Sequence, residues 1–564
     1  MSRRFAISLF LFLCLVTGMH CFSKEEPVRH QITQWVQQLG NDSFLVRQRA
    51  ETLLIRAGVQ AYPELQRARR NSDVEIVRRA EYILSQIEQT FLDMENRETA
   101  YWIRLYTLDP NPAGKARIIW ALADPYLDLV KGEGLQTLIR LVRFEENISL
   151  RLEAAKSLIA SPPFAPMARQ KWYQHVRDTT NNTGDDELLT TLTDYAKLWC
   201  DLDDVDKKIT QELQDQVRQV SAATLRLLER QENRIQSGSK IDILLHYAIA
   251  ELQEAVGLLE DRDATVSRAL AIDPGAIQTA EPIAQIALED GLLMNEHYHV
   301  GWYLKQRYRD RWAIAHLQRV MESGEVSLRL EASKFAAESA ILLMDYTAAI
   351  AFFDKHIEII RGPDHERGDG ETVVTMAQRR QAYCLAEKAA AVGNWEGVRE
   401  TIVKTWAKEL PGNRDISGIG GNIDLLIVAH RLSKQLPDID HEFRDAMDFQ
   451  FRKIWNSIIA HYDSVTTPDL RQINMVIAFN WAAWLLANTD GDYQSALTLV
   501  EAALKIEPDD IAILDTLAHV YFLGGNVDEA IRIQEQVVRF APDAVVFQHA
   551  LEQFKKKKAA DSAL

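Results

Sequence analysis

Residues 480–542 read NWAAWLLANTDGDYQSALTLVEAALKIEPDDIAILDTLAHVYFLGGNVDEAIRIQEQVVRFAP, and this stretch decides the fold. Three pairs of residues in it are separated by 34 positions: Gly491 and Gly525, Ala496 and Ala530, Pro508 and Pro542. A pair of antiparallel helices requires such a pattern. Alanine allows two backbones to approach closely, glycine closes the turn between the helices, and proline stops the second helix. The stretch therefore predicts two stacked helical hairpins.

This pattern resembles tetratricopeptide repeats. The stretch from Asn480 to Ala487, followed by Leu514 to Ala518, also resembles a terminal repeat pair that recurs in large bacterial proteins, including exported ones. The resemblance implies a superhelical stack whose concave face binds peptides or helices of other proteins. The residues at the motif positions are Ala483, Gly491, Ala496, Ala503 and Pro508 in the first unit, whose first helix is slipped by one residue, and Leu517, Ala518, Tyr521, Gly525, Ala530 and Pro542 in the second.

Weaker copies of the same unit precede this pair. The helix ending from Ala269 to Pro274 repeats the one from Ala503 to Pro508, and the segment from Asp345 to Ile350 matches that from Asp492 to Leu497. Residues 393–398 and 311–315 show the same turn followed by a helix. These copies predict degenerate tetratricopeptide-like repeats over residues 241–410.

A different repeat occupies the N-terminal part. Arg49-Ala50-Glu51 recurs thirty residues later as Arg79-Ala80-Glu81, and a leucine follows three residues after each copy. Val-Arg pairs stand beside both copies, and a third copy lies between residues 134 and 161. This resembles HEAT-type helical repeats. The whole chain is therefore predicted to be all-α, an α-solenoid of helical hairpins that is HEAT-like at the N-terminus and tetratricopeptide-like at the C-terminus.

Between the two repeat regions, apolar residues spaced in threes and fours from Leu213 to Leu227 predict one long helix that packs within the monomer. The predicted organisation has seven parts. They are a signal peptide (1–23), HEAT-like repeats (24–95), a divergent helical region with a HEAT-like unit (96–235), degenerate tetratricopeptide-like repeats (241–410), a helical connector (411–475), tetratricopeptide repeats (476–554) and a basic tail (555–564).

The N-terminus predicts export to the periplasm or cell envelope. Arg3 and Arg4 precede an apolar run over residues 5–16, which is shorter than the ~20 residues that span a bilayer. Cleavage is expected after Gly18 or Ser23, and Cys21 leaves lipidation as an alternative. No later run is long enough to cross a membrane, so no integral membrane segment is expected after the signal is removed.

Net charge and cysteine content argue against a nucleic-acid-binding protein and against a disulfide-stabilised scaffold. The formal charge is −17, and cleavage after Ser23 removes two arginines and makes it about −19. A surface this acidic repels phosphate backbones, so we expect no nucleic-acid partner. Cys200 and Cys384 are too far apart in sequence to form a disulfide framework and are expected to be buried thiols.

Four segments resemble chemical sites, and a structural role explains each of them better. His297 and His299 are two residues apart, so on a helix they point to different faces. Residues 364–371 form an acidic loop without calcium-loop spacing, residues 490–501 lack the glycine such a loop needs, and residues 418–421 lack a preceding strand. We therefore predict no catalytic residue, no metal site and no cofactor.

The sequence favours an exported scaffold or adaptor whose partners are other proteins or peptides. The groove positions of the terminal repeats include Trp481, Leu485, Asp515 and His519, which supply no cluster of basic residues for a terminal carboxylate. Trp481, Trp484 and Tyr521 are candidate anchors for a partner in the groove, because large aromatic residues dominate contact energy, but most such residues in helical repeats are core residues, and this is the favoured interpretation. Two alternatives stay open: an enzyme with a site in residues 160–240 or 410–470, and an envelope component that assembles through its repeats.

Overall fold

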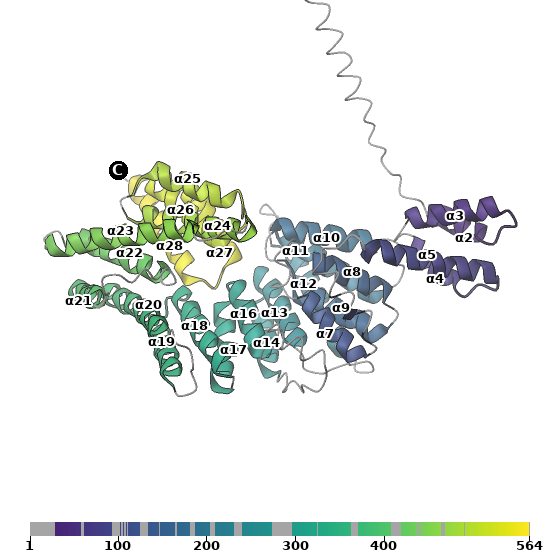
Figure 1. The fold of residues 1–564 in the computed structure, drawn as a ribbon, viewed down its shortest axis with the longest axis horizontal. Coiled ribbons are helices and arrows are strands. Elements are labelled where there is room, and N and C mark those ends of the chain that lie inside the picture. Colours follow the sequence, from purple (N-terminus) through teal and green to yellow (C-terminus); the bar gives the residue numbers. More distant parts are fainter. Residues whose placement is uncertain are drawn as a thin grey trace, which may run out of the picture. The chain divides into compact units, whose positions relative to one another are not determined.

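In the computed structural model every regular element of the described residues is a helix, so the predicted all-α helical-repeat fold is confirmed (Figure 1). None of the helices in the described ranges is both long and apolar enough to cross a membrane. The structure describes residues 29–57, 61–92, 102, 105–106, 109, 111–123, 133–145, 147–163, 166–180, 186–203, 209–229, 240–272, 296–323, 325–362, 370–407, 419–436, 439, 441–463, 468–489 and 491–562. The predicted signal peptide lies outside these residues.

The chain divides into two compact units, one made of residues 1–155 and 172–195 and the other of residues 156–171 and 196–564. Three helices pass from one unit to the other: α9 (Ile148–Ala160), α10 (Pro166–Thr180) and α11 (Glu187–Asp203). The remaining helices of the first unit are α2 (Arg29–Gln38), α3 (Phe44–Ala57), α4 (Tyr62–Ala68), α5 (Val74–Leu92), α7 (Pro112–Leu122) and α8 (Glu133–Phe144).

The second unit holds all later helices. They are α12 (Gln211–Glu229), α13 (Lys240–Ala255), α14 (Leu259–Ala271), α16 (Glu296–Gln306), α17 (Asp310–Ser323), α18 (Val326–Leu342), α19 (Tyr346–Arg361), α20 (Gly370–Ala391), α21 (Trp395–Trp406), α22 (Ile419–Gln435), α23 (His441–Asp463), α24 (Pro468–Asn488), α25 (Tyr493–Leu504), α26 (Ile511–Leu523), α27 (Val527–Phe540) and α28 (Val545–Ser562).

In the first unit, the repeated Arg-Ala-Glu motif stands where α3 packs against α5. Ala50 and Ala80 are completely buried, which allows the helices to approach closely. Arg79 bonds Glu51 of the other motif copy at 2.8 Å and also Glu75 at 2.7 Å. The recurrence therefore marks a shared packing position, while the resemblance of this part to HEAT-type repeats stays a prediction.

Five hairpins of the second unit share one turn. The residue two positions before the first residue of the second helix has a positive φ, and the next backbone N–H donates to the carbonyl five residues earlier, which is the Schellman motif. This geometry caps the C-terminal end of the first helix and reverses the chain. The positive-φ residues are Gly257 (77°), Tyr308 (55°), Met344 (55°), Gly393 (71°) and Gly525 (77°), and the N–H donors are those of Leu258, Arg309, Asp345, Asn394 and Asn526.

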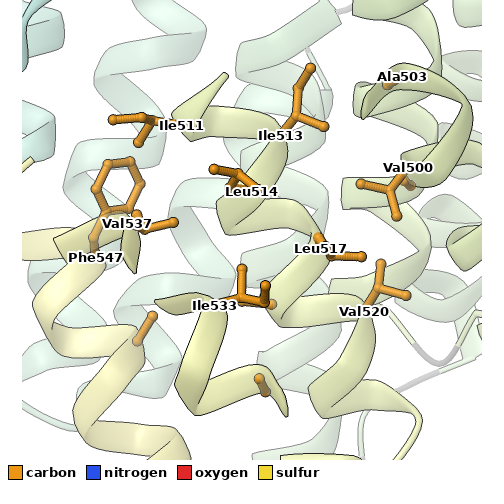
Figure 2. Close-up of a cluster of buried hydrophobic side chains, with 14 of the residues drawn as sticks. Val500, Ala503, Ile511, Ile513, Leu514, Leu517, Val520, Ile533, Val537 and Phe547 are labelled. Carbon is orange, nitrogen blue, oxygen red and sulfur yellow. The ribbon is translucent and has the colours of Figure 1, made fainter. Parts of the chain in front are cut away.

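The terminal repeats enclose a continuous apolar core. Figure 2 shows side chains of α25, α26, α27 and α28 gathered between their helices, with Leu514 and Leu517 of α26 among them. Val500 and Val537 are completely buried there, and Phe547 of α28 extends the same core. Each helix therefore buries its apolar face against neighbouring hairpins, as a repeat stack requires.

Two further segments bear on the predicted organisation. Leu213 and Val217 of α12 are buried in a contact with α13, so this part of the apolar seam packs within the monomer. Lys555 to Lys558 continue α28 as exposed helical residues, with Lys555 bonded to Glu535 at 2.7 Å and Lys558 to Asp528 at 2.6 Å. The basic segment is therefore the solvated end of a helix.

Candidate functional site

The repeat-defining residues are structural. Ala483, Ala496, Ala503, Ala518 and Ala530 are completely buried, which lets neighbouring helices pack closely. Leu517 belongs to the same core and Tyr521 packs against it. Pro508 and Pro542 each follow the second helix of a hairpin. Of these residues, Pro542 also lines the cavity described below.

Gly491 and Gly525 occupy matching positions but are needed for different reasons. Gly525 has a φ of 77°, in the left-handed region that L side chains rarely adopt. At Gly491 an added Cβ would lie 2.6 Å from the carbonyl oxygen of Leu486. The 34-residue spacing therefore preserves a turn by two distinct physical constraints.

The predicted groove positions are largely filled by the chain itself. Leu485 is completely buried in a cluster with residues of α22 and α23, and Asp515 is 7% exposed and accepts a hydrogen bond from Gln534 at 2.7 Å. His519 lies between Trp484 and Phe554, with ring centroids 4.7 and 5.2 Å away. At these positions the groove of the two repeats is thus occupied by side chains of the protein itself and is not an open binding surface.

Burial dominates the titration of the groove residues. It raises the pKa of Asp515 to about 7, despite the hydrogen bond from Gln534, which acts in the opposite direction. It lowers the pKa of His519 to about 4. Trp481 and Trp484 pack against the apolar cluster around Leu485, which fits the interpretation of these aromatics as core residues.

The two histidines of α16 diverge, as helix geometry predicts. The Nδ1 atom of His297 lies 2.9 Å from Nδ1 of His316, whose Nε2 atom lies 2.7 Å from the Tyr247 hydroxyl. Burial lowers the pKa of His299 well below its ordinary value. Among the residues that the structure describes, no group of three or more His, Cys, Asp or Glu side chains is arranged to hold a metal ion.

The other segments weighed as sites have structural placements where they are described. The Asp492 carboxylate caps α25 by accepting from the Ser495 amide at 2.7 Å, and residues 419–421 begin α22. Residues 363–369 and 490 lie outside the described residues. Burial raises the pKa of Cys200 to about 11 and that of Cys384 to about 12, so both are weakly reactive thiols.

A cavity of about 420 Å³ in the second unit brings together residues that are distant in sequence. Its wall includes four arginines and four acidic residues, from the ends of α10 and α11, from α13, from the turn before α17 and from the end of α27. The charged lining residues are Arg169, Arg307, Arg309, Arg539, Asp201, Asp203, Glu251 and Glu254; the apolar ones include Trp199, Ile209, Leu213, Phe540 and Pro542.

Buried ion pairs organise this wall. Both oxygens of Asp203 accept from Arg169, at 2.6 and 2.9 Å. Both oxygens of Glu251 accept from Arg307, with Nε at 2.9 Å from Oε1 and Nη2 at 2.5 Å from Oε2. Burial by itself raises the pKa of Glu251, but the nearby guanidiniums outweigh it and the net shift is downward. Glu251 is therefore a carboxylate, not a proton donor.

A strained turn aims two of these arginines at Glu251. Tyr308 adopts a φ of 55°, a left-handed conformation that is rare for a bulky residue. Arg307 and Arg309 flank it; Arg307 also donates to the Pro162 carbonyl at 2.8 Å, and Arg309 lies 3.5 Å from Glu251. Tyr308 packs on Phe547, with ring centroids 5.7 Å apart.

Sequence reasoning missed this cavity. Its charged residues come from positions up to 370 apart, from Arg169 to Arg539, and no motif spacing marks these charged residues. The one available signal was the Arg307-Tyr308-Arg309-Asp310 run at an expected helix turn, where the repeat pattern places glycine. The charges of this run indicate a site only once the structure shows that Glu251 and Glu254 pair with its arginines.

The comparisons with known proteins agree with the sequence pattern at the C-terminus. Among curated proteins none matches the chain. In structure the chain is similar to the human IFIT1 dimer with PPP-AAAA, at 13% sequence identity, with 92% of this chain and 97% of that chain covered and a TM-score of 0.21. Residues 487–554 match the tetratricopeptide repeat family, so the resemblance is confirmed in the segment where the 34-residue pattern is clearest.

Proposed function

We propose that this protein is an exported scaffold or adaptor that binds other proteins or peptides on the surface of its helical repeats. The single observation that carries the proposal is the tetratricopeptide match over residues 487–554, because stacked hairpins present extended surfaces for partners. Export rests on the N-terminal sequence, and the acidic charge of the chain supports protein partners over nucleic acid.

The burial pattern narrows the proposed contact surface to the end of the stack. At the groove positions of the two terminal hairpins, α24–α25 and α26–α27, Leu485 and Asp515 are buried. The next helix, α28, leaves His549 and Gln553 exposed, and Ala512 of α26 is exposed as well. A partner that follows the tetratricopeptide mode would therefore contact α28 and the exposed edge of α26.

Site-specific crosslinking in intact cells tests this proposal. Photoreactive residues are placed at His549 and Ala512, with Glu501 as a control because it is exposed on α25, the second helix of its hairpin. We expect the first two positions to capture the same discrete partner, identified by mass spectrometry, and Glu501 to capture little. Purified protein should then bind that partner directly. Equal, indiscriminate capture at all three positions would overturn the proposal.

Cell fractionation tests the proposed export. An exported chain should appear in the periplasmic or envelope fraction without its first residues, and a cytoplasmic full-length chain would contradict export.

The cavity falls partly in residues 160–240, where an enzymatic site was the alternative. Its carboxylate Glu251 is held ionised by arginines, whereas a general acid needs a raised pKa, so Glu251 does not serve as a general acid there.

A further inference from the structure

More arginine N–H donors than carboxylate oxygens remain available for hydrogen bonds in the cavity. The formal charges of its lining side chains balance, with four arginines and four acids. Three of the four acidic side chains, however, already bond guanidiniums. Asp203 and Glu251 each spend both oxygens on one guanidinium, and Glu254 accepts from Arg262 at 2.7 Å and from Arg309 at 2.5 Å.

Three guanidiniums keep N–H groups for another acceptor. Arg169 spends Nε and Nη2 on Asp203, and its Nη1 has no hydrogen bond to the described residues. Arg309 is 7% exposed; its Nη1 bonds Glu254, and its buried Nε makes no hydrogen bond within the described part of the chain but lies 3.5 Å from Oε1 of Glu251. Arg539 donates to the Leu202 carbonyl and, among the described residues, contacts no carboxylate.

The arginines are also crowded. Burial lowers the pKa of Arg169, and the neighbouring charge of Arg307 lowers it further, although Asp203 acts in the opposite direction. Arg169 lies over the ring of Trp199 at 4.8 Å and near Phe540 at 5.9 Å, which holds its plane in place. An added negative charge would relieve this repulsion and accept the unused N–H groups.

The volume of the cavity and its apolar lining residues indicate what the part of the ligand beyond its anionic group is like. A volume of about 420 Å³ lies in the range of small-molecule pockets, and Ile209, Leu213 and Pro542 offer apolar surface beside the guanidiniums. We propose that this cavity binds a small organic anion, with a carboxylate or phosphate group held by Arg169, Arg309 and Arg539 and a short apolar body against the remaining wall.

Such a site lies away from the groove positions of the tetratricopeptide hairpins. Arg539 and Phe540 end the second helix of the last matched hairpin, and this end meets the cavity. The proposal is independent of the protein-binding function, because the full chain can fail to capture a partner and still bind the anion.

Calorimetric titration of the full chain with phenyl phosphate and benzoate tests the proposal, with neutral benzamide as the control ligand. We expect saturable binding of at least one anion and none of benzamide. Peptides with a free or an amidated C-terminus then distinguish a chain end from a free small molecule. Tighter binding of the free-carboxylate peptide alone would identify a chain end as the source of the anion.

Two matched variants locate the site. Arg539→Gln should weaken anion binding at least about tenfold, since a charged hydrogen bond contributes about 1.5–3 kcal/mol. Arg532→Gln, on the same exposed helix but paired with Glu529, should leave the affinity unchanged. Arg539 is exposed and its loss leaves no buried carboxylate unpaired, so the variant is expected to fold. Absence of saturable binding up to about 10 mM, or equal affinity in both variants, overturns the proposal.

Discussion

At the residue scale, one turn position explains why some repeats were easy to recognise and others were not. Gly257, Gly393 and Gly525 have the positive φ that the hairpin turn needs, and glycine adopts it without steric cost. Tyr308 and Met344 adopt nearly the same conformation with side chains attached. The repeat period is therefore visible where glycine is retained and obscured where packing holds a bulkier residue in the same turn.

Replacing Gly525 should separate conformational cost from crowding. An added Cβ would meet no atom within 4 Å, so Gly525→Ala is expected to destabilise the α26–α27 hairpin only through its φ, by about 1–2 kcal/mol. Gly525→Asn should cost less, because asparagine tolerates this region. Hydrogen exchange of the hairpin amides measures both; equal costs for the two variants would contradict the explanation.

Asp515 should make stability depend on pH. Its pKa is about 7 in the folded chain and about 3.9 when unfolded, so between these values the folded state binds the extra proton. Stability is then fully present below about pH 4 and declines as pH rises to about 7. Asp515→Asn removes this decline, and its stability advantage over the original chain should grow across that window to about 4 kcal/mol.

Thermal unfolding at a series of pH values provides the measurement for Asp515. Asp528→Asn is the matched control, because this side chain is 78% exposed on the neighbouring helix α27. Its difference from the original chain should stay nearly constant over the same range. A constant difference for Asp515→Asn as well would show that the carboxyl group is not protonated in the folded state.

At the element scale, helix starts were predicted well because their signals are local. Asp345, Asn394 and Asp492 cap α19, α21 and α25 by accepting a backbone N–H three residues later, and each belongs to a turn-then-helix copy seen in the sequence. Side-chain caps act within one turn, so neighbouring residues suffice to specify them. How helices pair is not local in this sense and needed the 34-residue period.

The caps of the terminal hairpin offer a paired test. Asp510 accepts from the Ile513 amide at 3.0 Å at the start of α26, whereas Asn526 at the start of α27 makes no side-chain cap bond. Asp510→Ala should therefore destabilise the hairpin by about 1 kcal/mol, and Asn526→Ala by clearly less. Chemical denaturation of both variants supplies the comparison, and a larger loss at Asn526 would refute the assignment.

At the scale of the whole molecule, the second unit is held together by charges as well as by its apolar cores. Glu251 of α13 bonds Arg307, which also donates to the Pro162 carbonyl, and Arg169 of α10 bonds Asp203 of α11. Elements far apart in the sequence thus share one buried ion-pair network. Breaking such a pair leaves an uncompensated charge in a place that water does not reach.

Removing the charge of Glu251 should accordingly be costly. Glu251→Gln leaves the buried guanidinium of Arg307 without its carboxylate and is expected to destabilise the protein by about 3–5 kcal/mol. Glu535→Gln breaks the exposed pair with Lys555 and should cost less than about 1 kcal/mol. Thermal unfolding midpoints decide the matter, and similar shifts for both variants would argue against a structural role of the network.

The amino-acid sequence by itself determined the all-α class, the terminal tetratricopeptide pair and the positions of its turns, because periodicity, caps and turn residues act over a few residues or one repeat. Tertiary structure alone decided which predicted groove residues are open. Leu485 and Asp515 are closed off by packing that no repeat pattern encodes. It also assembled the arginine-lined cavity, since Arg169, Glu251, Arg309 and Arg539 meet only when distant helices pack. Local rules fix the hairpins, but long-range packing and burial fix which side chains stay exposed.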